Sequence, residues 1–140
     1  MSWHRTNERG AVSSEFAIVM AVVLISFAAL AIYGGRVVQA ENDVQSAAQD
    51  AARAATLEAT PEAADAAARS VAQRNLDTSG QSCAGGSTVD VDLSHFTPGG
   101  EVTVTITCLA DFSDVATLGV AGSSTFTASA TEVIDVYRGP

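Results

Sequence analysis

One carboxylate, Glu15, lies at the start of the longest apolar run of the chain, where a charge needs a partner. A charged side chain placed deep in a membrane helix costs on the order of 2–3 kcal/mol. If the chain were cut after Gly10, Ala11 would carry a new ammonium group, and Glu15 would lie one helical turn away from it. Glu15 could then pair with its own amino terminus or with that of a neighbouring subunit. The second pairing would set the register between subunits.

Two cysteines, Cys83 and Cys108, lie in the polar C-terminal part of the chain. An even number of cysteines downstream of a membrane segment is typical of a disulfide formed in an oxidising compartment. A loop of about 25 residues closed by such a bond would stabilise the fold by roughly 3 kcal/mol on the chain-entropy account. The alternative is a pair of buried, reduced thiols.

No other residues have the spacing of a catalytic or metal site. The histidines, His4 and His95, have no second ligand at metal-binding distance in the sequence, and the cysteines are too far apart for a C-x-x-C redox pair. Asp90 and Asp92 would share one face of a strand, where solvated carboxylates are favoured over a calcium site. We therefore predict that the protein is not an enzyme and uses no metal, no cofactor and no small-molecule substrate.

The charge balance excludes another class of partner. The chain of 140 residues carries 16 acidic and 7 basic residues, a formal charge of −9, and all its basic residues are arginines. Nucleic-acid binding needs clustered positive charge, which is absent from this sequence. The mean hydropathy of +0.22 is high for a soluble protein, and the apolar residues are concentrated in one segment.

That segment divides the chain into four predicted parts. Residues 1–10 form a short polar leader, and residues 11–35 form a transmembrane helix, because they contain an apolar run of the ~20 residues that span a bilayer core. Arginines in the leader, at positions 5 and 9, predict a cytoplasmic N-terminus and an outward-facing remainder. Residues 36–59 continue the helix as a stalk without Pro or Gly, and residues 60–140 form an extracytoplasmic head.

The stalk and the head show two different periods. A weakly apolar helical stripe is formed by Val37, Val44, Ala47, Ala48, Ala51, Ala55 and Leu57. Thr60 and Pro61 have the residue types of a helix cap and a first helical position, so we predict a second helix over Pro61–Leu76. Alternating apolar and polar residues then predict strands in the ranges 89–94, 101–108 and 126–136.

Together these elements predict an α+β fold. A hairpin-length connection joins the first two strands, and a longer crossover, residues 111–123, joins the second strand to the third. The result is a three-stranded antiparallel sheet with one apolar face. We expect the second helix and the distal part of the long helix to cover that face.

The N-terminal residues resemble the type IV prepilin processing site: a short basic leader that ends in Gly10, Glu15 as the fifth mature residue, and an apolar helix. More narrowly, RGAVSSEFAIVMAVVLI followed by GRVVQAENDVQSAAQDAARAA is similar to the TadE-like family of pseudopilins from tight-adherence (Flp) pilus systems. The late segment FTASATEVIDVYR is similar to the terminal strand of those proteins. Two residue types differ from the usual pattern, since Ala11 stands where many type IV pilins have Phe, and Ser13-Ser14 make the helix start more polar.

The resemblance implies a minor pilin or pseudopilin that a prepilin peptidase cuts between Gly10 and Ala11. It implies assembly, or priming of assembly, through the N-terminal helix, with Glu15 and Phe16 at its start. Implied partners are the membrane, the prepilin peptidase, other pilin subunits and the pilus assembly platform. The expected location is a single-pass position in the cell membrane or incorporation in an extracellular pilus. The role as tip, primer or shaft component stays open.

Two other interpretations fit the same apolar run. The first is an uncleaved single-pass anchor that presents an extracytoplasmic binding or adhesion domain, for which a face rich in Thr and Ser could serve. The second is a secretory signal peptide, because Val38-Gln39-Ala40 before Glu41 resembles a small-residue cleavage site. An apolar run longer than 7–15 residues and the presence of Glu15 argue against the signal peptide.

Overall fold

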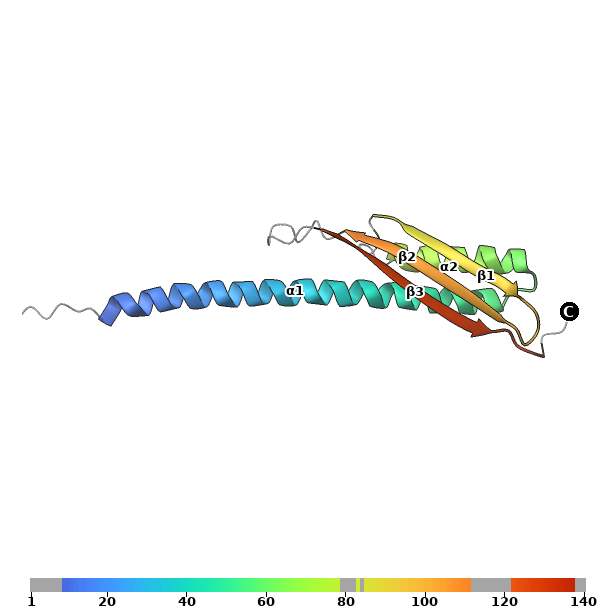
Figure 1. The fold of residues 1–140 in the computed structure, drawn as a ribbon, viewed down its shortest axis with the longest axis horizontal. Helices are drawn as coiled ribbons and strands as arrows, with labels where there is room; N and C mark the ends of the chain where they lie inside the picture. The colour runs from blue at the N-terminus through green and yellow to red at the C-terminus, as the bar shows by residue number, and fades with distance from the viewer. Residues whose placement is uncertain (1–8, 79–82, 84, 112–121, 138–140) are drawn as a thin grey trace, which may run out of the picture. The chain divides into compact units, whose positions relative to one another are not determined.

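The computed structural model describes residues 9–78, 83, 85–111 and 122–137, with side chains from Ser14 onward. Two helices precede three strands along the chain (Figure 1). The chain divides into two compact units, Met1–Gly35 and Arg36–Pro140. The first unit contains the apolar part of the first helix, and the second contains all the remaining elements.

Helix α1 runs from Arg9 to Thr56. It ends three residues before the predicted position 59, because the last turn tightens: the amides of Leu57 and Glu58 donate to the carbonyls of Ala54 and Ala55, each at 3.2 Å. Leu57 was predicted as part of the apolar stripe, but it lies beyond the helix end and is 73% exposed. The remainder of the predicted stripe is buried, except for the half-buried Val37.

Helix α2 runs from Pro61 to Thr78, two residues beyond the predicted end. Thr60 caps it as predicted: its Oγ1 accepts a hydrogen bond from the amide of Ala63 at 3.3 Å, and its carbonyl accepts one from Ala64 at 2.9 Å. Residues at a spacing of four form the buried face of this helix: Ala64, Ala68, Ala72 and Leu76. This spacing keeps one narrow stripe of α2 directed into the core.

The three strands are β1 (Ser87–His95), β2 (Glu101–Asp111) and β3 (Ser123–Val133), in the order β1-β2-β3 with antiparallel pairing. This is the predicted sheet, although β3 begins and ends three residues earlier than the predicted range 126–136. The predicted crossover over residues 111–123 falls largely outside the described residues. Central strand β2 alternates strictly between buried and more exposed positions, which gives the sheet its apolar face.

The core of the second unit lies between this face and the two helices. Its strand residues include Val102, Val104, Ile106 and Cys108, and its helical residues are almost all alanines. The sheet is therefore covered by α2 and the distal part of α1, as the sequence predicts (Figure 1). Small side chains at both helix faces let the backbones approach closely, which keeps this core thin.

Two glycines close the hairpin between β1 and β2. Gly99 has a φ of 80°, which favours glycine, and a Cβ on Gly100 would lie 1.9 Å from the His95 carbonyl oxygen. The turn also holds the residue that follows β3: Gly99 donates to the Ile134 carbonyl at 3.0 Å, and Ile134 donates to Gly100 at 2.8 Å. Ile134 thus leaves the predicted strand and fills the end of the core, where it is buried.

Candidate processing and assembly segment

The predicted processing and assembly residues lie at the start of α1. The helix begins at Arg9, so the peptide bond between Gly10 and Ala11 belongs to its first turn. Glycine in a helix is about 1 kcal/mol less favourable than alanine, so this turn opens more easily than one built on alanine. Glu15 follows Ala11 by four residues, the spacing at which two groups on a helix become neighbours.

Glu15 and Phe16 are both exposed, with Phe16 at 66%. An exposed carboxylate beside an exposed aromatic ring gives this end of the helix both a charged and an apolar contact for another chain. The structure thus leaves both residues accessible to a partner. The cut after Gly10 and the pairing of Glu15 stay predictions.

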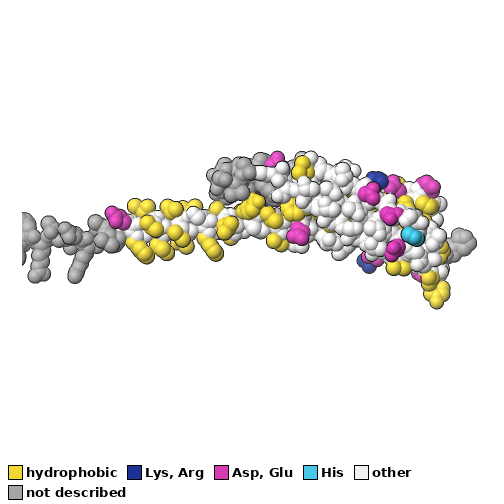
Figure 2. All heavy atoms as spheres, viewed as in Figure 1, with side chains coloured by type: hydrophobic (Ala, Val, Ile, Leu, Met, Phe, Trp, Pro, Cys, Tyr) yellow, Lys and Arg dark blue, Asp and Glu magenta, His cyan; other side chains and the backbone are white. Residues whose placement is uncertain are grey.

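The rest of the first unit presents apolar side chains around the helix. An 18-residue window within Ser14–Thr56 has a mean hydropathy of 2.7 and is 0% buried, and this helix is long and apolar enough to cross a membrane. Figure 2 shows the apolar side chains projecting along it, and Phe27, for example, is 72% exposed. The hydroxyl of Ser26 donates to the Val22 carbonyl at 2.8 Å, so this polar group is satisfied within the helix. The segment has the surface of a membrane anchor.

The predicted disulfide is present in the second unit. Cys83 and Cys108 are joined with a Cα–Cα distance of 5.1 Å, and neither is a free thiol. Cys108 is completely buried on the apolar face of β2, whereas Cys83 is half-buried. A bond in this position links the segment that precedes β1 to the central strand.

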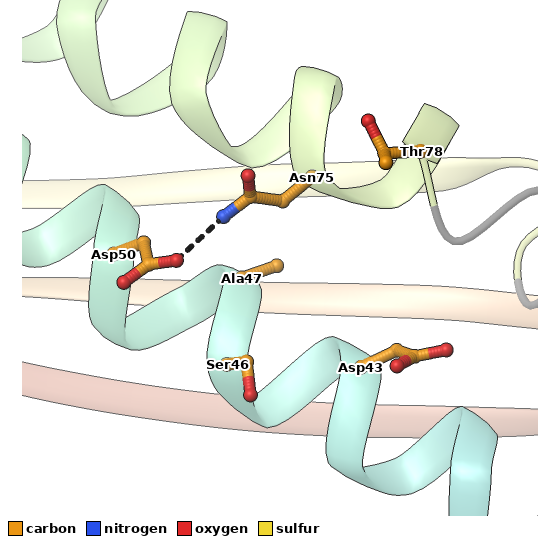
Figure 3. Close-up of a pocket in the computed structure, with 6 residues that line it drawn as sticks. All are labelled: Asp43, Ser46, Ala47, Asp50, Asn75 and Thr78. Carbon is orange, nitrogen blue, oxygen red and sulfur yellow. Dashed lines mark hydrogen bonds between the residues drawn. The ribbon is translucent and has the colours of Figure 1, made fainter.

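A shallow pocket lies between helices α1 and α2. It has a volume of about 270 Å³ and is lined by Asp43, Ser46, Ala47, Asp50, Asn75 and Thr78 (Figure 3). Asn75 Nδ2 donates to Asp50 Oδ2 at 2.8 Å, a contact that joins α2 to α1. The lining side chains are two carboxylates, two hydroxyls, one amide and one methyl group.

A second pocket, of about 420 Å³, lies beside Arg69 and the first residues of β1. Arg69 Nε donates to both carboxylate oxygens of Asp65, at 3.0 and 2.9 Å, and its Nη1 donates to the Val89 carbonyl. Hydrogen bonding to Asp65 raises the pKa of Arg69 above its ordinary value. This arginine therefore joins α2 to strand β1 and is already engaged within the fold.

The isolated histidine and the strand carboxylates behave as surface groups. The hydroxyl of Ser94 lies 3.1 Å from His95 Nδ1, and the amide of Ser94 donates to Asp92 Oδ1 at 2.9 Å. This backbone hydrogen bond lowers the pKa of the exposed Asp92 carboxyl. Within the described ranges there is no group of three or more His, Cys, Asp or Glu residues that could hold a metal ion.

Residues 10–53 match the family model described as TadE-like protein. The resemblance to the TadE-like family is thereby confirmed over the N-terminal segment. The match covers 44 of the 140 residues. No curated protein and no solved structure gives a significant match.

The matched range begins at Gly10 and ends within the alanine-rich part of α1, so it contains every predicted processing and assembly residue. The sheet and α2 lie outside it. Sequence reasoning missed two contacts that involve this unmatched part: Arg69 donates to the Val89 carbonyl within it, and Asn75 of α2 donates to Asp50, which lies in the matched range. Each joins residues at least twenty positions apart, and no local pattern signals such a pairing.

Proposed function

We propose that this protein is a minor pilin or pseudopilin of a Tad-type pilus, cut between Gly10 and Ala11 and assembled through the start of α1. The observation that carries the proposal is the coincidence of three features within residues 10–53: the family match, the Gly10-to-Glu15 spacing, and an apolar helix whose side chains are exposed. The proposed partners are a prepilin peptidase, other pilin subunits and the assembly platform.

The proposed chemistry of assembly is electrostatic. Cleavage creates an ammonium group on Ala11 of each subunit, and Glu15 of a neighbouring subunit neutralises it. In an apolar surrounding, an ion pair that loses one partner leaves an uncompensated charge, so subunits shifted out of register are strongly disfavoured. Phe16 adds an apolar contact next to the pair. The N-terminus lies in the cytoplasm before cleavage, and the second unit lies outside, where its disulfide persists.

The first test is the intact mass of the protein extracted from membranes of cells that carry their own peptidase. A chain that begins at Ala11 is the expected result, and Gly10→Val should leave it beginning at Met1. A wild-type chain that begins at Met1 would replace this proposal with the static anchor. A chain that begins at Glu41 would make it a secreted protein.

The second test separates cleavage from assembly. Glu15→Ala should still be cut, but it should be lost from sheared pilus fractions, because the carboxylate that pairs with the new terminus is missing. Glu41→Ala, also an exposed glutamate of α1, is the matched control and should behave as wild type. Normal recovery of Glu15→Ala in pili would contradict the pairing.

The alternative function is adhesion by the second unit through the hydroxyl-rich outer face of its sheet. The outer face of the sheet carries cross-strand hydroxyl pairs, with Thr103 and Thr131 at 2.8 Å and Thr105 and Ser129 at 3.1 Å. These hydroxyls already bond to one another, which leaves fewer of their groups for a ligand. Deletion of residues 77–140 with unchanged surface attachment and pilus display would remove this alternative.

A further inference from the structure

The two cysteines of the disulfide differ in burial. Cys108 is among the largest fully buried side chains, and it belongs to the central strand, where Ser87 and Phe126 are its cross-strand neighbours. Cys83 is half-buried and packs at the margin of the core. A thiolate that attacks a disulfide must reach one sulfur in line with the other, so the half-buried cysteine offers the easier approach in the folded protein.

The segment that carries Cys83 is held on β2 by its own contacts. Gly85 donates to the Leu109 carbonyl, and Leu109 donates to the Gly86 carbonyl, each at 2.9 Å. Gly86 has a φ of 112°, and its amide donates to the Cys83 carbonyl at 2.9 Å. A Cβ on Gly85 would lie 2.7 Å from Leu109 Cγ, so any residue other than glycine at position 85 would force the neighbouring atoms to move. The paired glycines therefore place Cys83 against the end of the core.

We propose that the Cys83–Cys108 disulfide undergoes thiol–disulfide exchange at one sulfur. Other thiols attack Cys83, and the buried Cys108 is the leaving and resolving sulfur. An incoming thiolate attacks Cys83 Sγ, the bond to Cys108 breaks, and Cys108 leaves as a thiolate that takes up a proton. Cys83 then carries the mixed disulfide. In the reverse step the Cys108 thiolate attacks Cys83 Sγ and expels the other thiolate, so the two steps balance without a further oxidant.

The same asymmetry governs formation of the bond from two thiols. The two electrons and two protons pass to the disulfide of a thiol–disulfide oxidoreductase, which is reduced to its dithiol. The mixed intermediate forms on Cys83, and Cys108 resolves it from within the core. The fold can therefore close or reopen this bond while the apolar face of the sheet stays covered.

The test uses the full-length wild-type protein in detergent with excess reduced glutathione. Freed thiols are alkylated at early times, and peptide mass spectrometry locates the glutathione. At least tenfold more glutathione on Cys83 than on Cys108 is expected, and the ratio should fall toward one in concentrated urea, where burial is lost. Equal labelling of both sulfurs in the folded protein, or labelling mainly on Cys108, would overturn the proposal.

A substitution at Gly85 gives the second measurement, the rate at which the mixed disulfide forms. Gly85→Ala pushes against Leu109, so the mixed disulfide should form several-fold faster than in wild type, still on Cys83. Gly122→Ala is the matched control, because a Cβ at Gly122 meets nothing within 4 Å and should leave the rate unchanged. If Gly85→Ala formed the mixed disulfide at the wild-type rate, the contact between Gly85 and Leu109 would not limit access to Cys83.

Discussion

Helix α1 contains two stretches with opposite surfaces. Between Phe16 and Ile32, large apolar side chains cover the helix and stay exposed. Between Ala40 and Ala55, the side chains directed to the core are nearly all alanines and are fully or almost fully buried. The larger apolar groups are thus exposed and the smaller ones buried, the reverse of what hydrophobicity alone would give in water.

This difference shows that the two stretches face different surroundings. A helix that exposes Phe, Ile and Leu on all sides is stable only in an apolar environment or against other helices. An alanine face instead needs a partner with little room between backbones, which α2 and the sheet provide. Pairs of substitutions, one in each of two regions, can test this interpretation.

The largest effect is expected in the core. Ile106→Ala removes the largest fully buried side chain, which should lower the free energy of unfolding of the second unit by about 2–5 kcal/mol. Urea denaturation of the full-length protein in detergent, followed by circular dichroism, measures it. Ile25→Ala, at an exposed apolar position, is the control and should leave this transition in place. Equal losses in both variants would contradict the division between exposed and packed surfaces.

The second-largest effect is expected from a new charge, which should affect membrane retention in the apolar stretch of α1 but not in the alanine-rich stretch. Leu24→Asp places a carboxylate in the middle of the apolar stretch, and its insertion cost of about 2.5–3.5 kcal/mol should reduce the fraction of protein that stays with membranes after alkaline extraction. Gln49→Asp, at an exposed position of the second stretch, should leave that fraction unchanged. Full membrane retention of Leu24→Asp would show that this stretch does not cross the bilayer.

Added side-chain volume should have the opposite pattern: it should destabilise the protein in the alanine-rich stretch of α1 but not in the apolar stretch. Ala51→Leu inserts three extra carbons at a fully buried position of the alanine face and should destabilise the second unit by about 1–3 kcal/mol in the same urea assay. Ala21→Leu adds the same volume to an exposed position and should leave the transition unchanged. If Ala51→Leu were neutral, the packing of this face would be looser than its burial indicates.

Much of the fold could be predicted because its signals are local. The alternation on β2, the cap at Thr60 and the change of period after α2 each depend on residues close together in the sequence. The end of α1 was harder, because the apolar Leu57 continues the stripe while the backbone has already tightened into the turn. Helix ends depend on single hydrogen bonds, which a periodic pattern does not record.

The candidate site divides in the same way. Glu15 after Gly10 is a signal of spacing and charge, so the sequence alone identifies it. The glycine pair that holds the disulfide segment on β2 gives no such signal, because neither the residue types nor the spacing of Gly85 and Gly86 marks their role. Their role depends on the approach of Leu109, more than twenty residues away, and that approach exists only in the folded sheet.

The smallest expected effect is on the stability of the second unit at low pH. The pKa of Asp92 is lowered from its ordinary value of 3.8 by the amide of Ser94, so its contribution to stability is present above that pH and is lost as the pH falls through the lower folded-state value. Asp92→Asn should flatten this small acid-side loss in urea titrations between pH 5 and about pH 2, with Asp90→Asn as the control. Residues 16–32 contain no ionisable side chain, so membrane retention should not change over the same range. A loss of retention in step with the unfolding of the second unit would mean that the apolar stretch depends on the folded head for its place in the membrane.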